Sequence, residues 1–70
     1  MDAAHPPVVV HAPQPTGRRV TILGEDAGLA TGPDDVREFL RRAGLEDAEP
    51  DDPGLVEWRG GGPGHWLPEG

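Results

Sequence analysis

The chain has no cysteine, no serine and no lysine among its 70 residues. Without cysteine, disulfide bonds and thiolate metal sites are excluded, and the lack of serine removes a common nucleophile of hydrolases. No apolar run approaches the roughly 18 residues that a membrane-spanning helix needs, and the first residues lack the basic and apolar segments of a secretory signal. From these absences we expect a cytoplasmic protein that is not an enzyme, binds no cofactor and does not contact a membrane.

Charged residues, glycines and prolines are distributed unevenly along the chain. The formal net charge is −7, and all basic residues other than histidine are arginines. Eleven glycines and nine prolines concentrate toward the ends, so only about 40 residues have a composition suited to a packed domain. The apolar residues expected to face its interior are Val20, Ile22, Leu29, Val36, Phe39, Leu40, Leu45, Val56 and Trp58, with Leu23 and Leu55 as further candidates. So small a core supplies little burial energy, and a partner or self-association would stabilise it.

The strongest periodic signal lies in the middle of the chain. Apolar residues recur there at the i, i+3, i+4 and i+7 positions of one helix face: Val36, Phe39, Leu40 and Ala43. Pro33 suits a first helical turn, and either Thr31 or Gly32 fits the N-cap. Gly44 is typical of the left-handed residue that follows a helix. These signals predict a helix over about residues 33–43.

Three further segments have the composition and alternation of β-strands. They are residues 18–23, 27–31 and 55–59, with the turn residues 24–26 between the first two. Together with the helix they predict a small α+β domain over residues 18–59, in the order ββαβ. The helix is expected to cover one face of a three-stranded antiparallel or mixed sheet.

Residues 1–17 are rich in proline and are predicted to form a flexible arm. Val8, Val9 and Val10 are the exception, because consecutive β-branched residues favour an extended strand. They either add an edge strand to the sheet or stay extended until a partner supplies a sheet edge. A disordered tail with three valines is the simpler interpretation.

Residues 60–70 have the glycine and proline content of a flexible tail, but this tail carries Trp66 and Leu67. The apolar pair either folds back onto the small sheet, whose core leaves surface uncovered, or is presented to a partner as a short recognition motif. The candidate partner-binding residues are therefore those of the valine segment and of the tail: Val8, Val9, Val10, Arg59, Trp66 and Leu67.

No catalytic or metal-binding constellation is recognisable in the sequence. His5, His11 and His65 lack the spacing of metal-binding motifs, so no metal site is predicted. The acidic segment 46–53 lacks the spacing and the glycine of a calcium loop, and we interpret it as a solvated loop. The run GGGPG does not open a helix, so it lacks the setting of a phosphate-binding loop.

Several phrases occur together along the chain: RRVTI, DVREFLRRAGL, an acidic linker, and VEWRGGGP followed by Trp66. In this combination the chain resembles a group of short uncharacterised proteins of Streptomyces and related actinobacteria. The resemblance covers roughly residues 18–66, and EFLRRAGL and EWRGGGP are its most specific parts. It implies no particular activity. It does imply that the segment 59–63 is more than a linker, because glycines beside Trp58 let another backbone approach closely.

The sequence favours a non-enzymatic protein–protein interaction module that binds an unknown protein partner or associates with itself. One alternative is a nucleic-acid-associated regulator that grips phosphates through Arg18, Arg19, Arg37 and Arg41, although the net charge of −7 would repel a polyanion. The other alternative is a self-assembling structural subunit, in which an open sheet edge pairs with its copy.

Overall fold

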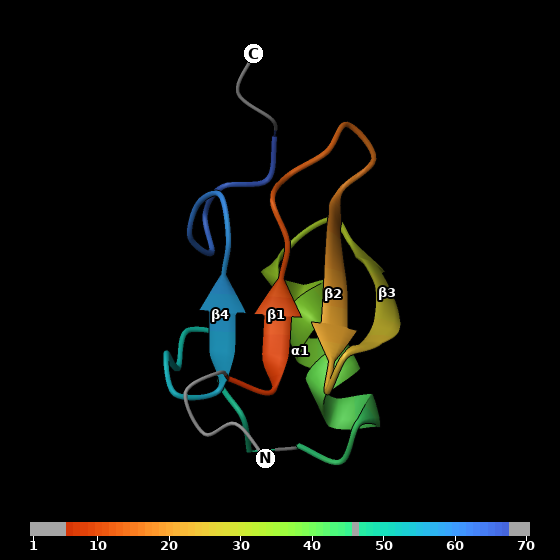
Figure 1. Cartoon of the computed structure of the whole chain (residues 1–70), viewed down its shortest axis with the longest axis vertical. Helices are drawn as coiled ribbons and strands as arrows, with labels where there is room; N and C mark the ends of the chain where they lie inside the picture. Colours follow the sequence, from red (N-terminus) through yellow and green to blue (C-terminus); the bar gives the residue numbers. More distant parts are fainter. Residues whose placement is uncertain (1–5, 46, 68–70) are drawn as a thin grey trace.

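The computed structural model of the chain describes residues 6–45 and 47–67. Within these residues the elements are, in order, β1 (Val8–Val10), β2 (Arg18–Ile22), β3 (Glu25–Ala30), α1 (Pro33–Arg42) and β4 (Val56–Trp58). The strands form one sheet in the order β3-β2-β1-β4, and α1 packs against one face of it (Figure 1). This arrangement confirms the predicted α+β class, with one more strand ahead of the predicted ββαβ unit.

The additional strand, β1, lies inside the sheet and not at its edge. It pairs antiparallel with β2 on one side and parallel with β4 on the other. Val8 and Val10 are fully buried, while Val9 points to the opposite face and is half-buried. The structure therefore differs from the expected arm with at most an edge strand; residues 1–5 of that arm lie outside the described residues. The prolines that suggested an arm flank the strand, where they remove no hydrogen bond from the sheet.

The core lies between α1 and the sheet. Its buried side chains are Val8, Val10, Val20, Ala30, Val36, Leu40 and Val56. Phe39 and Trp58, which were expected in the core, are half-buried against this cluster. The expectation for Leu29 was wrong: it pairs with the exposed Arg19 of β2 and lies on the face that turns away from α1. The reason is that Ala30 takes the buried position, and neighbours in a strand point to opposite faces.

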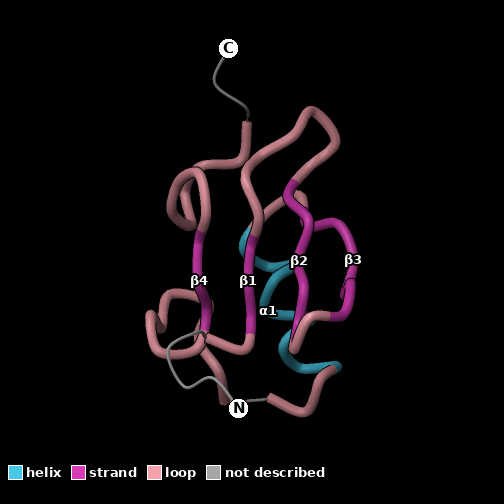
Figure 2. The backbone as a smooth tube through the Cα atoms, in the orientation of Figure 1, coloured by secondary structure: helices cyan, strands magenta, loops and turns pink. Residues whose placement is uncertain are grey.

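The C-terminal end of α1 follows the predicted pattern. Gly44 has a φ of 88° and donates its N–H to the carbonyl oxygen of Arg41 at 3.0 Å. Leu45 donates its N–H to the carbonyl oxygen of Leu40 at 2.9 Å. Both hydrogen bonds of a Schellman motif are thus formed. The chain then leaves the helix as a loop and returns to the sheet as β4 (Figure 2).

At the start of α1, Gly32 is the N-cap, and Thr31 before it forms hydrogen bonds to the first turn of the helix. Thr31 donates its backbone N–H and its hydroxyl to Oδ2 of Asp35, each at 2.8 Å. Both hydrogen bonds lower the pKa of Asp35 below its usual value, and the one from the backbone has the larger effect. The Asp35 carboxylate therefore ties the end of β3 to the first turn of the helix.

Replacement of Asp35 by asparagine tests this contact through pH. Because folding lowers the pKa of Asp35, its charged form contributes stability above about pH 4, and the contribution is lost as the pH falls through the folded-state pKa. We expect D35N to be less stable than the wild type at pH 7, by less than about 1 kcal/mol since solvent screens the charge. The stability difference should shrink as the pH falls below about 4 and vanish once the pH lies below the folded-state pKa.

Urea unfolding at a series of pH values measures this difference, and D34N is the matched control in the same helical turn. A stability difference between D35N and the wild type that stays constant with pH would contradict the assigned role of the Asp35 charge.

Candidate functional site

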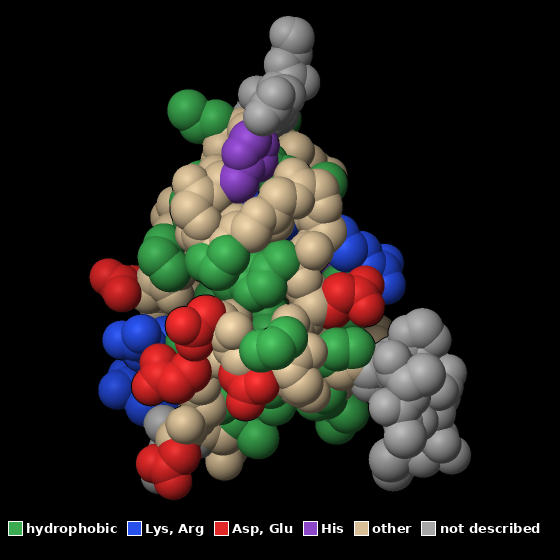
Figure 3. Space-filling view, turned by 90° about the vertical axis from the view of Figure 1, so that its left-hand side faces the viewer, with side chains coloured by type: hydrophobic (Ala, Val, Ile, Leu, Met, Phe, Trp, Pro, Cys, Tyr) green, Lys and Arg blue, Asp and Glu red, His purple; other side chains and the backbone are tan. Residues whose placement is uncertain are grey.

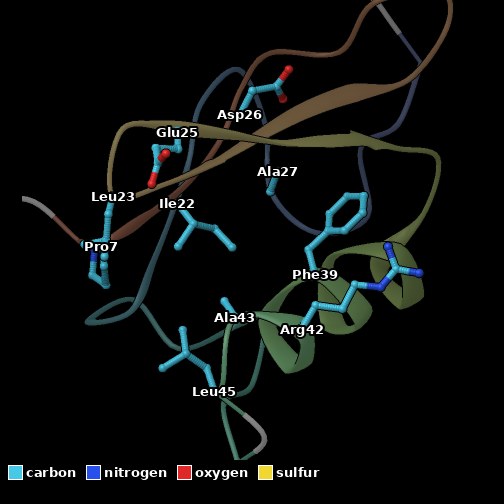
Figure 4. A pocket seen from close by; sticks show the side chains of 10 residues that line it. All are labelled: Pro7, Ile22, Leu23, Glu25, Asp26, Ala27, Phe39, Arg42, Ala43 and Leu45. Carbon is cyan, nitrogen blue, oxygen red and sulfur yellow. The ribbon is translucent and has the colours of Figure 1, made fainter.

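An apolar groove lies between the β2–β3 turn and the C-terminal end of α1 (Figure 4). Its volume is about 470 Å³. Most of its lining is apolar and comes from Pro7, Ile22, Leu23, Ala27, Phe39, Ala43 and Leu45. The charged residues Glu25, Asp26 and Arg42 complete the lining. We call this site the Leu23 groove.

The groove exists because only small side chains lie between the sheet and the helix at this end of the core, and they leave space unfilled. Ile22 is the last residue of β2 and lies at the base of the groove (Figure 4). Ala27 from β3 and Ala43 from the end of α1 extend toward the same space with one methyl group each. The sheet and the helix therefore do not meet here, and apolar surface stays accessible to solvent.

Two walls face each other across the Leu23 groove (Figure 4). The hairpin wall is the β2–β3 turn with Leu23 and Glu25, and the helix wall is the end of α1 with Phe39 and Arg42. Arg42 is highly exposed and lies 3.4 Å from a carboxylate oxygen of Glu38 on its own helix. The groove thus has an apolar interior with the Glu25 carboxylate at the hairpin wall, while the Arg42 side chain starts at the helix wall and extends away from the hairpin (Figure 4).

Leu23 combines two unfavourable features at the edge of this groove. It has a φ of 53° and precedes Gly24, which has a φ of 83°. Two-residue hairpin turns need positive φ at both central positions, and they usually contain Asn-Gly or Asp-Gly because a leucine there is strained by about 1–2 kcal/mol. The Leu23 side chain is also 77% exposed. Strained, exposed apolar residues of this kind are a recognised mark of functional sites.

A second unusual centre is the fully buried Arg18 at the start of β2. Its five N–H groups donate to backbone carbonyl oxygens, those of His11 (2.8 Å), Arg59 (2.6 Å), Gly61 (2.9 Å), Gly62 (2.9 Å) and His65 (2.7 Å). Desolvation by burial lowers the pKa of Arg18 below its usual value. All donors of the guanidinium are satisfied, and every buried polar side-chain atom in the described part of the chain has a partner.

Two indole rings flank the Arg18 guanidinium and complete what we call the Arg18 cluster. The guanidinium carbon lies 5.1 Å from the ring centre of Trp58 and 5.6 Å from that of Trp66, within the range of cation–π attraction. The two rings meet edge to face, with centres 6.0 Å apart. Their indole N–H groups donate to the carbonyl oxygens of Pro50 and Pro63. The cluster is therefore a packed and fully hydrogen-bonded unit, not an open binding site.

The Arg18 cluster changes the interpretation of the glycine-rich segment after β4. We expected residues 60–70 to have the composition of a tail whose Trp66 and Leu67 either fold back or are presented to a partner. Residues 60–66 fold back around Arg18, and residues 68–70 lie outside the described part. A buried cation needs acceptors, and the glycine carbonyls supply them. A Cβ atom on Gly60 would lie 2.7 Å from the Cβ atom of Ala12. Glycine at this position therefore allows the segment around Ala12 to approach closely.

The six candidate partner-binding residues do not come together on one surface. Val8 and Val10 are fully buried, so they belong to the core and are not available to a partner. Trp66 folds back onto the Arg18 cluster, whereas the side chain of Leu67 is 75% exposed. Arg59 is exposed, forms an ion pair with Glu57, and contributes its carbonyl oxygen to Arg18.

The Leu23 groove contains none of those six residues and was missed in the sequence. Its helix wall was predicted as a helix, but the space beside it depends on tertiary packing. No signal in the sequence marked it, because Leu23 was assigned to the strand 18–23 and the turn to residues 24–26. Only the structure shows that Leu23-Gly24 occupies a turn where Asn-Gly or Asp-Gly is usual.

The arginines considered for phosphate binding do not form a common surface. Arg18 is buried. The other three each contact an acidic side chain: Arg19 with Asp26 at 2.6 Å, Arg37 with Glu49 at 3.5 Å, and Arg41 with Glu38. The surface that the nucleic-acid alternative requires is therefore not assembled by these four residues.

In the acidic segment between α1 and β4, the described carboxyl residues Asp47, Glu49, Asp51 and Asp52 are exposed. Figure 3 faces the β4 side of the molecule and shows acidic side chains interspersed with apolar and basic ones. Among residues 6–45 and 47–67, no three His, Asp or Glu side chains gather where they could hold a metal ion; His5 and Glu46 lie outside these ranges. No helix in the described part of the chain has the length and apolar content needed to cross a bilayer.

Comparison of the chain with protein-family models, with curated proteins and with solved structures gives no match.

Proposed function

We propose that this chain is a non-enzymatic protein–protein interaction module and that the Leu23 groove is its binding site. The observation that carries this proposal is Leu23, which is strained in its backbone, 77% exposed in its side chain, and located on the wall of an apolar groove. Each of these features costs stability in the isolated chain. A partner that covers Leu23 and fills the groove would recover the hydrophobic part of that cost.

The size and chemistry of the groove support a protein partner. Its volume of about 470 Å³ exceeds that of a single side chain, so the groove can hold more than one apolar side chain of a partner. Full burial of a leucine side chain contributes about 1.5–3 kcal/mol. Leu23 and one or two apolar side chains of a partner therefore suffice for a small hot spot. Glu25 and Arg42, which start from opposite walls, would orient that partner.

Comparative capture from a native lysate tests the proposal. The baits are the wild type, L23N and L67N, where Leu67 is an exposed leucine outside the groove and serves as the matched control. Asparagine adopts positive φ more readily than leucine. We therefore expect L23N to be as stable as the wild type or more stable by about 0.5–1 kcal/mol, so that lost binding cannot be attributed to unfolding.

We expect a protein, identified by quantitative mass spectrometry, that the wild type and L67N capture and L23N does not. An untagged copy of the chain itself counts as such a protein. If L23N keeps everything that the wild type captures, the Leu23 groove is not a binding site and the proposal fails.

A further inference from the structure

We infer that the occupant of the Leu23 groove is a second copy of this chain, in a two-fold dimer in which Leu23 of each copy enters the groove of the other. This inference rests on the proposed function and names the partner. It makes the binding site incomplete in one copy, because the second copy contributes the side chain that fills it.

The first argument is that the exposed Leu23 side chain and the groove lie side by side on one surface of the chain. In a two-fold dimer the same patch of both copies meets, so a residue that projects from the patch must find its receptor on that same patch. Leu23 projects from the hairpin wall, and the space beside it is bounded by Phe39 and Ala43 on the helix wall (Figure 4). A two-fold axis along the groove places the hairpin wall of each copy against the helix wall of the other.

The second argument is the charge on the two walls. The same axis brings Glu25 of one copy to Arg42 of the partner subunit, and it makes this contact twice. Glu25 is exposed, and Arg42 is 71% exposed with only a 3.4 Å contact to Glu38. Asp26, the other acidic residue of the groove, is held by Arg19 at 2.6 Å and adds little net charge. The patch is therefore complementary to itself in charge as well as in shape.

The third argument concerns the strength of the dimer. A standard stable interface buries about 800 Å² on each partner, which is about one sixth of the 4576 Å² that this chain exposes. The groove and its two walls form a smaller patch around one leucine anchor. The chains also repel each other, since each carries a net charge of −7. These terms favour a weak and reversible dimer over a stable one.

Sedimentation equilibrium of the purified chain from about 1 μM to about 1 mM, a range that brackets micromolar association, tests the inference. We expect the wild type and L67N to show the same monomer–dimer equilibrium. L23N should dimerise at least tenfold more weakly while its urea unfolding midpoint is unchanged or higher. A wild type that stays monomeric throughout this range overturns the inference, and so does an L23N protein that dimerises as strongly as the wild type.

A charge exchange tests the predicted orientation of the two copies. In E25R and R42E the two contacts between the walls become repulsive, so each variant alone should dimerise about tenfold more weakly than the wild type. In an equimolar mixture of the two variants both contacts become attractive again, and heterodimers of near wild-type affinity should form. If the mixture associates no better than the separate variants, the two-fold arrangement is wrong.

These results separate the inference from the proposed function. A monomeric wild type whose capture of another protein still depends on Leu23 overturns the dimer and leaves the groove as a binding site. A chain that neither dimerises nor captures any protein through Leu23 overturns both.

Discussion

Replacement of Arg18 by lysine is expected to lower the free energy of unfolding by about 3–5 kcal/mol, the range for breaking a buried charged network. Lysine has three donors on a single nitrogen, so it cannot reach the five carbonyl oxygens that Arg18 satisfies. A domain of this size has a total stability of only about 3–10 kcal/mol. We therefore expect R18K to be largely unfolded, or to release residues 59–66 from the sheet.

Urea unfolding followed by tryptophan fluorescence measures this effect, because Trp58 and Trp66, the two tryptophans of the chain, pack against the guanidinium. The matched control is R19K, the same substitution one residue later. Arg19 is exposed and bound to Asp26, so R19K should cost less than about 0.5 kcal/mol. An R18K protein that unfolds within about 1 kcal/mol of the wild type would show that the cluster is not what holds the segment.

Replacement of Gly17 by alanine is expected to cost about 2–5 kcal/mol. Gly17 has a φ of 133°, and a Cβ atom on it would lie 2.5 Å from the carbonyl oxygen of Ala30. The left-handed backbone contributes about 1–2 kcal/mol and the overlap with backbone atoms about 1–3 kcal/mol. The clash cannot be relieved locally, because Gly17 is tied to Gln14 by hydrogen bonds of 2.8 and 3.0 Å.

The control for this substitution is G64A. A Cβ atom on Gly64 would meet no other atom within 4 Å, and the φ of Gly64 lies outside the left-handed range, so G64A should change the stability by less than about 0.5 kcal/mol. Urea unfolding of both variants gives the comparison. Equal stability of G17A and G64A would mean that the turn before β2 does not approach β3 closely.

The sequence predicted those parts of the fold that depend on neighbouring residues. The helix α1 was predicted within a residue because its periodicity, its proline and Gly44 are local signals. The strands β2 and β4 were predicted from their alternation. β1 was placed as an edge strand at most, because three valines between prolines carry no information about which strands will lie on either side of them.

The Arg18 cluster was beyond sequence-based prediction for the same reason. Alternation along β2 puts Arg18 on the face of Val20, which is the buried face, so a signal for burial was present. The sequence did not show which groups would accept hydrogen bonds from a buried Arg18, because four of the five carbonyl acceptors lie between 41 and 47 residues further along the chain. Arginine without a visible partner is usually on the surface, and the glycine-rich segment that provides the acceptors has the composition of a linker.

Prediction of the Leu23 groove would have needed even more knowledge of the tertiary structure than prediction of the Arg18 cluster. Its walls come from a turn and a helix end that were both predicted, but their separation depends on how α1 lies across the sheet. Ala27 and Ala43 are unremarkable as sequence, and only their positions opposite each other leave the space open. Leu23 was assigned to a strand, and the strain of its backbone became apparent only with the turn geometry.

The pairing of β1 with β4 has a consequence for the order of events during synthesis. Among the strands of this sheet, β1 is synthesised before the others and pairs on one side with β4, which is synthesised after them. The buried Arg18 of β2 depends on acceptors in the segment that follows β4. A nascent chain that ends before residue 59 therefore has every strand of the sheet but a cation with most of its acceptors missing. The Arg18 cluster closes only when residues 59–65 have emerged, so until then the unsatisfied guanidinium disfavours the folded sheet and leaves the chain exposed to chaperones and proteases.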